Sequence, residues 1–173
     1  MGVVGFFAPH TFTTTNQMEL LTIRDGKEVW LHQIDRPFVF NLPFPDRRYV
    51  AMVFCNDETV TDAERQVVSH ALFVSGCRYG LFAGHECGAW EKALDLACIA
   101  SDPDYDPSDE AFTMTTAHKN EPVEDVIFFG LMNTCFGSHD FTRFLILFIG
   151  PRVGLRNEVD LAIQSVWFPT KSV

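Results

Sequence analysis

One stretch decides the expected fold, Arg78-Tyr-Gly-Leu-Phe-Ala-Gly-His-Glu-Cys-Gly-Ala-Trp-Glu-Lys-Ala-Leu-Asp95. Its apolar start at 79–83 is typical of a buried strand, and a helical pattern opens at Ala89. Between them the turn 84–88 begins and ends with glycine, which permits a sharp change of chain direction. In open α/β folds, a turn that joins a strand to the next helix lies at the carboxyl edge of the sheet, where ligands bind. The stretch therefore predicts a fold class and the place of a site.

The segments around this stretch repeat the alternation of strand and helix. Strands are predicted at 49–54, 79–83, 111–117 and 141–149, and helices at 61–76, 89–99, 122–134 and 155–166. The first helix opens with a capping box, because Glu64 stands three residues after Thr61. Such alternation favours right-handed crossovers and a mostly parallel sheet with helices on both faces. We predict an α/β fold, a single Rossmann-like or flavodoxin-like sandwich with a mostly parallel central sheet and a β-rich N-terminal extension.

The first 46 residues differ from the rest of the chain in their sequence pattern, which has short β-prone runs but no helical segment. Two short β-prone runs, 18–23 and 27–32, flank Asp25-Gly26, a dipeptide that is a strong hairpin signal. Prolines then punctuate an extended segment at 38–42. We predict a β-rich arm or subdomain over 1–46 and an α/β sandwich domain over 47–173.

The composition bounds the class of protein. The chain has 173 residues, of which 47% are hydrophobic and 17 are Phe. These values exclude a disordered chain and predict an aromatic core. Thirteen basic against 23 acidic residues give a net charge of −10, which repels phosphate backbones, so no nucleic-acid partner is expected. Acidity suits a basic protein partner, and it equally keeps a Phe-rich protein in solution.

The cysteine pattern and the N-terminal sequence indicate the cellular location of the protein. The five cysteines are odd in number and lack metal-knuckle spacing, which is typical of reduced thiols in a cytoplasmic protein. The apolar N-terminus has no basic start, so we expect no signal peptide. No run approaches about 20 apolar residues, so no membrane partner is expected either. We predict a cytoplasmic location.

Polar side chains follow each predicted parallel strand, and all these loops emerge at one edge of the sheet. The loop residues are Cys55, Asn56, Asp57 and Glu58, then His85, Glu86 and Cys87, then His118, Lys119, Asn120 and Glu121, and finally Pro151 and Arg152. We predict that His85, Asn56, Lys119 and Glu121 bind a ligand there. The alternative is ordinary loop polarity.

The central turn also offers a nucleophile. A strand, a Gly-x-x-x-Gly turn and a helix resemble the nucleophile elbow of α/β hydrolases and glutamine amidotransferases. The turn departs from that pattern, because Glu86 occupies the central position and Cys87 comes one residue later. If the site is catalytic, Cys87 is the nucleophile, His118 its base and Asp57 the residue that orients the base, with Glu86 beside them. The alternative is a cysteine that packs under the start of the helix.

No cofactor or metal is predicted. His85, Cys87, His118 and Asp57 are chemically acceptable zinc ligands, but the chain has no dense metal-binding spacing. Glycine-rich dinucleotide and triphosphate motifs are also missing from the sequence. Glu86 and Asp57 suit the ribose of a nucleoside only by analogy with other proteins of this fold class.

Two blocks carry a family resemblance. Residues 75–95, with Gly-Cys-Arg-Tyr, Gly-His-Glu-Cys and Trp-Glu-Lys-Ala-Leu-Asp, and residues 115–125, Thr-Thr-Ala-His-Lys-Asn-Glu-Pro-Val-Glu-Asp, resemble an uncharacterised bacterial family known as a domain of unknown function. The similarity covers about the central half of the chain. It implies a bacterial cytoplasmic protein with an α/β core, and it carries over no catalytic residue.

Two functions remain open at this stage. The acidity, small size and lack of an intact catalytic motif favour a protein-binding module that acts as an immunity or operon-accessory factor. The alternative is an enzyme, a Cys/His hydrolase or a nucleoside-processing protein, whose site lies at the carboxyl edge. The oligomeric state is left open.

Overall fold

The computed structural model describes residues 18–39, 44, 48–137, 139–150 and 154–167. These residues form six strands and four helices in the order β1 (Glu19–Arg24), β2 (Lys27–Ile34), β3 (Tyr49–Cys55), α1 (Asp62–Val74), β4 (Cys77–Gly84), α2 (Cys87–Ile99), β5 (Met114–His118), α3 (Val123–Met132), β6 (Arg143–Ile149) and α4 (Leu155–Trp167). None of these helices combines the length and the apolar character needed to cross a membrane.

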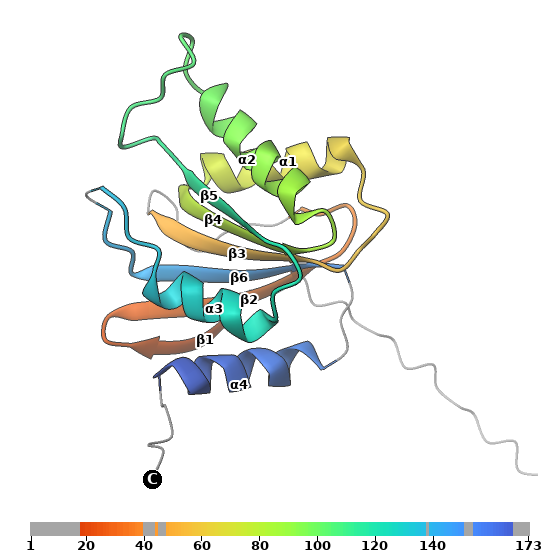
Figure 1. The fold of residues 1–173 in the computed structure, drawn as a ribbon, viewed down its shortest axis with the longest axis vertical. Helices are drawn as coiled ribbons and strands as arrows, with labels where there is room; N and C mark the ends of the chain where they lie inside the picture. Colours follow the sequence, from red (N-terminus) through yellow and green to blue (C-terminus); the bar gives the residue numbers. More distant parts are fainter. Residues whose placement is uncertain (1–17, 40–43, 45–47, 138, 151–153, 168–173) are drawn as a thin grey trace, which may run out of the picture.

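All six strands belong to one sheet with the order β1-β2-β6-β3-β4-β5. Only the β1–β2 pair is antiparallel among the described strands, and the other four pairings are parallel. The predicted α/β class with a mostly parallel sheet is therefore confirmed. The strand that comes last in the chain, β6, lies in the interior of the sheet between β2 and β3 (Figure 1).

Helices cover both faces of the sheet. Figure 1 shows α1 and α2 on one face and α3 and α4 on the other. Along β3, Val50, Met52 and Phe54 belong to the core under α3 and α4, whereas Ala51 and Val53 belong to the core under α1 and α2. Because both faces are buried, the strand is apolar at every position instead of alternating with polar residues.

The N-terminal strands extend the edge of this sheet. Asp25 and Gly26, with φ of 50° and 77°, form the tight turn that joins β1 to β2, as the Asp-Gly signal predicts. β2 then pairs with β6 along nearly its whole length, from Glu28 opposite Arg143 to Ile34 opposite Ile149. The described strands of the β-rich segment are thus continuous with the main sheet, and its Phe38 and Phe44 are buried in the core under α1 and α2. A division of the chain at residue 46 stays a prediction.

The ends of the elements follow local hydrogen bonds. The capping box is present: the Glu64 amide donates to Thr61 Oγ1 at 3.3 Å and the Thr61 amide to Glu64 Oε2 at 2.8 Å. α2 begins at Cys87, two residues before the predicted start. The strand predicted from Ala111 begins only at Met114, because the amides of Ala111 and Phe112 donate to the Ser108 carbonyl in a turn.

Candidate functional site

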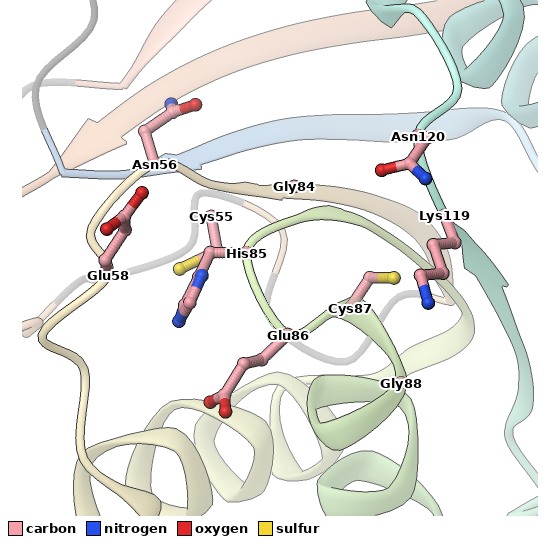
Figure 2. A pocket seen from close by; sticks show the side chains of 10 residues that line it. All are labelled: Cys55, Asn56, Glu58, Gly84, His85, Glu86, Cys87, Gly88, Lys119 and Asn120. Atoms are coloured by element: carbon pink, nitrogen blue, oxygen red, sulfur yellow. The ribbon is translucent and has the colours of Figure 1, made fainter.

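The chain topology places a crevice at the carboxyl edge. β4 leads to α2 on one face of the sheet and its neighbour β5 leads to α3 on the other, and α/β proteins bind ligands where the connections after adjacent strands diverge in this way. A cavity of about 710 Å³ lies at the carboxyl ends of β3, β4 and β5 (Figure 2). It is lined by Cys55, Asn56, Glu58, Gly84, His85, Glu86, Cys87, Gly88, Lys119 and Asn120.

The turn after β4 is built by a close approach of two strands. Gly84 has φ +83°, and a Cβ at this position would lie 2.3 Å from the Cys55 carbonyl oxygen. The next amide, that of His85, donates to the same oxygen at 2.9 Å. Only glycine fits this geometry without strain. The turn is therefore locked to the end of β3, and the side chains of His85 and Cys55 line the same cavity.

The start of α2 faces the cavity. Cys87 is the first residue of the helix, is 5% exposed and lines the cavity, as does the exposed Gly88. The preceding residue, Glu86, adopts the left-handed conformation and its side chain makes no capping hydrogen bond. The first turn of α2 has no acidic residue either. The partial positive charge of this helix end is consequently not offset by a carboxylate of the helix itself.

The carboxylate of Glu86 is turned toward α1. Arg65, 4% exposed, donates to Glu86 and to Asp62, and its guanidinium lies 5.6 Å from the Trp90 ring centroid. Figure 2 shows the Glu86 side chain directed away from Cys87 and Lys119. Sequence reasoning missed Arg65. Its position on the buried face of α1 could have indicated it, because a buried charged side chain needs an ionic partner.

Asp57 is held by its own loop. Its Oδ1 accepts hydrogen bonds from the Thr59 hydroxyl at 2.6 Å and the Thr59 amide at 2.8 Å, and Arg36 pairs with its other oxygen. The Thr59 donors, followed by Arg36, lower the pKa of Asp57. Asp57 does not appear among the described residues that line the cavity.

Arg36 links this loop to α1, because it pairs with both Asp57 and Glu64. The pairing with Glu64 makes the stability of the fold depend on pH. Hydrogen bonds from Arg36, then from Thr61, lower the pKa of Glu64 from 4.5 to about 2. A carboxylate with a depressed folded-state pKa contributes stability that is present above its unfolded-state pKa and is lost as pH falls through the folded-state pKa. The contribution of Glu64 should therefore disappear between pH 4.5 and about 2.

We expect Glu64→Gln to lower the urea midpoint at neutral pH and to have a progressively smaller effect toward pH 2. Urea titrations of both proteins at several pH values measure this difference. Since Glu64 and Arg36 are partly exposed, with side-chain exposures of 30% and 42%, added salt should shrink the difference. Parallel pH profiles for the two proteins would show that the Arg36–Glu64 pair contributes nothing.

His118 is occupied by neighbours on its own segment. It is 5% exposed, its Nδ1 lies 2.7 Å from Glu121 Oε2, and its Nε2 lies 3.0 Å from Thr116 Oγ1. The Phe129 ring packs against it edge-on at 5.1 Å. Neither His118 nor Glu121 is among the described residues lining the cavity. The structure thus brings Cys87 to the cavity but gives His118 and Asp57 other hydrogen-bond partners.

The lining has two chemically different ends. In Figure 2 the Cys87 sulfur and the Lys119 side chain extend toward the same side of the cavity, near Asn120. Glu58 and His85 lie at the other side, near Asn56. Lys119 is exposed and forms no ion pair with the described residues. The predicted ligand-binding residues His85, Asn56 and Lys119 therefore line one cavity, and Glu121 does not. Pro151 and Arg152 fall outside the described residues.

In the described parts of the chain, no group of three or more His, Cys, Asp or Glu residues is arranged to hold a metal ion. All five cysteines are free, and Cys135 is the exposed one.

Comparison with known proteins identifies the family. Neither the curated proteins nor the solved structures yielded a match. The sequence model described as "Domain of unknown function (DUF7684)" matches residues 29–163, from β2 to α4. The match includes the sheet from β2 onward, all four helix starts and every cavity residue. Because it covers well over half of the chain, this protein belongs to the family Domain of unknown function (DUF7684).

Proposed function

We propose that this chain binds a small polar molecule in the carboxyl-edge cavity, with an anionic group of the ligand at Lys119 and hydrogen-bond donors of the ligand at Glu58 and His85. The observation that carries the proposal is one cavity lined by the loops after three successive parallel strands. Its volume of about 710 Å³ lies within the usual range of small-molecule sites.

The anionic end is supported by two features. The Lys119 ammonium has no carboxylate partner among the described residues, although the chain carries a net charge of −10. On the same side of the cavity, α2 begins at Cys87 and Gly88 without a side-chain cap. A ligand carboxylate or phosphate would meet both the ammonium and the first amides of the helix.

The opposite end supports a ligand that donates hydrogen bonds. Glu58 is exposed and His85 is half-buried, and both line the cavity. A carboxylate accepts hydrogen bonds only, and one nitrogen of a neutral imidazole does the same. Hydroxyl or amino groups of the ligand suit these acceptors. A phosphorylated sugar or nucleoside and an amino acid both combine such donors with an anionic group.

Lys119→Ala should weaken ligand binding about tenfold or more, since a hydrogen bond to a charged group contributes roughly 1.5–3 kcal/mol. The probes are ribose 5-phosphate, adenosine 5′-monophosphate and glutamate, titrated by ¹⁵N NMR on the full chain. Lys92→Ala is the matched control, because Lys92 is exposed on α2 but does not line the cavity.

Binding of any probe that is weakened by Lys119→Ala and unchanged by Lys92→Ala supports the proposal. If no probe shifts the amide signals of 84–88 at millimolar concentration, or if both variants bind alike, the cavity does not have the proposed role.

Cys87 favours an enzymatic role as a second candidate. Its sulfur lies on the lining beside Lys119 (Figure 2), so a bound ligand would meet a thiol. Hydrolysis of a probe ester that is lost in Cys87→Ala while ligand binding persists would support catalysis. Turnover that persists in the variant would contradict it.

A protein-binding role, as an immunity or accessory factor, is also proposed. The outer surface of α1 and α2 exposes Val67, Val74 and Leu96 by 63%, 64% and 52%, and exposed apolar groups of this kind occur at protein interfaces. A host protein that binds the Leu161→Glu variant, changed on α4, but not the Val67→Glu variant, changed on α1, would support this role. Equal binding to both variants would oppose it. We also propose a bacterial, cytoplasmic setting and a Rossmann-like or flavodoxin-like fold.

A further inference from the structure

A second cavity lies at the opposite edge of the sheet. It has a volume of about 450 Å³ and is lined by Arg48, Val74, Ser75, Gly76, Arg78, Ser108, Glu110 and Ala111. Arg48 directly precedes β3 and Arg78 stands at the start of β4, so the amino ends of two neighbouring strands bring the two guanidinium groups to one cleft. This amino-edge cleft shares no residue with the carboxyl-edge cavity.

The charge environment of these two arginines differs from that of the others. Elsewhere in the described chain, each arginine lies within 3.5 Å of a carboxylate oxygen, namely Arg24, Arg36, Arg65, Arg143 and Arg156. Arg48 approaches a carboxylate only at 3.9 Å, to Glu110, and no ion pair of Arg78 is found among the described residues. The two least neutralised arginines of an acidic chain therefore line the same cleft.

Arg78 is rigidly placed and keeps a donor group. Its Nε donates to the Glu110 carbonyl at 3.2 Å, and its Nη1 to the carbonyls of Cys77 and Phe73 at 2.8 and 3.2 Å. The guanidinium also lies 5.3 Å from the Phe73 ring centroid. Within the described chain, no acceptor is found for Nη2. The planar fork is thus positioned by backbone groups, and one of its nitrogens stays available to a ligand.

Arg48 is positioned from the buried side of the cleft. Its Nη1 lies 3.0 Å from Nδ1 of His139, which is 6% exposed. Because arginine only donates hydrogen bonds, Nδ1 is the acceptor and the imidazole proton is on Nε2, which donates to the Asp109 carbonyl at 3.3 Å. Glu110 faces the other nitrogen at 3.9 Å with its side chain 84% exposed. An exposed pair this long is weak, so an anion can displace it.

We infer that the amino-edge cleft is an oxyanion site, in which Arg48 and Arg78 bind a phosphate or carboxylate group. Guanidinium groups match the oxygens of both anions, and two of them in one cleft offer a bidentate arrangement. Glu110 competes with the ligand for Arg48. The inference stands independently of the ligand proposed for the carboxyl-edge cavity.

The test is titration of the full chain with pyrophosphate and, separately, with tricarballylate, observed through the arginine Nε–H signals and the amides of 74–78. We expect saturable binding of at least one probe. The probe that binds shows whether the site takes a phosphate or a carboxylate group. Arg48→Ala should weaken that binding roughly tenfold or more. Arg156→Ala is the matched control, because its side chain is 45% exposed, close to the 43% of Arg48.

Glu110→Gln keeps both arginines, the hydrogen bond of Arg48 to His139 and those of Arg78 to backbone carbonyls, so it tests the site with these contacts in place. It should tighten probe binding several-fold, since the competing carboxylate is removed. Lys119→Ala should leave binding unchanged, which separates this cleft from the carboxyl-edge cavity. Lack of saturation by either probe up to about 10 mM, or equal affinities of wild type, Arg48→Ala and Glu110→Gln, would overturn the inference.

Discussion

Gly84→Ala is expected to destabilise the folded chain by about 3 kcal/mol or more. The added methyl group would lie 2.3 Å from the Cys55 carbonyl oxygen, and a backbone atom cannot rotate away as a side-chain end can. The φ of +83° adds strain for any residue with a Cβ. Relief of the contact would separate the carboxyl ends of β3 and β4 and break the hydrogen bond from His85 to Cys55. Urea denaturation followed by circular dichroism measures the loss.

Gly26→Ala is the matched control for this experiment. Gly26 has a similar φ of +77°, but an added Cβ would meet nothing within 4 Å. It should therefore show only the conformational cost, on the order of 1 kcal/mol. The difference between the two variants isolates the close approach of Gly84 to Cys55. If both cost the same, the two strands are not locked together at the cavity.

Trp90→Ala should cost about 3–5 kcal/mol, the usual range for removal of a buried aromatic side chain. Trp90 is 0% exposed and stacks on Phe82 with ring centroids 6.5 Å apart and planes at 11°. The indole also lies beneath the guanidinium of Arg65. Its removal would leave a void under α2 and take away the apolar surface that supports the Arg65–Glu86 pair at the cavity rim.

Two further variants separate packing from the general effect of losing a tryptophan. Trp90→Phe keeps an aromatic ring and should recover part of the stability. Trp30→Ala removes a half-buried tryptophan that packs edge-on against Phe44, so the loss should be smaller than for Trp90→Ala. All are measured by urea denaturation. Equal losses at Trp90 and Trp30 would contradict the central place of Trp90 in the α1–α2 core.

Much of the fold was predictable because its signals are local. The continuous apolar runs that became β3 and β6 indicate strands covered on both faces. Thr61 with Glu64 marks the start of α1, and Asp25-Gly26 marks the first hairpin. The loops after β3, β4 and β5 were expected to converge, and eight of the loop residues do line one cavity: Cys55, Asn56, Glu58, His85, Glu86, Cys87, Lys119 and Asn120.

The order of the strands and the direction of individual side chains were not predictable. A strand that is apolar at every position gives no sign of its neighbours, so nothing local indicates that β6 lies between β2 and β3. The position of Asp57 depends on Arg36, 21 residues earlier, although the spacing to Thr59 is a turn signal that was available. His118, predicted to lie in the loop after the third strand, is instead the last residue of β5, and its ring turns into the core toward Phe129.

The interior position of β6 has a consequence for how the chain is made. During synthesis β1, β2 and β3 emerge first, yet β2 and β3 do not pair with each other and must wait for the strand that separates them. Partners such as Glu28 and Arg143 are far apart in the chain, and such distant pairings close slowly. Until residues 143–149 leave the ribosome, the hairpin and the β3–β5 half each keep an open apolar strand edge. Pairing of β6 with both β2 and β3 therefore completes the sheet by joining its two halves.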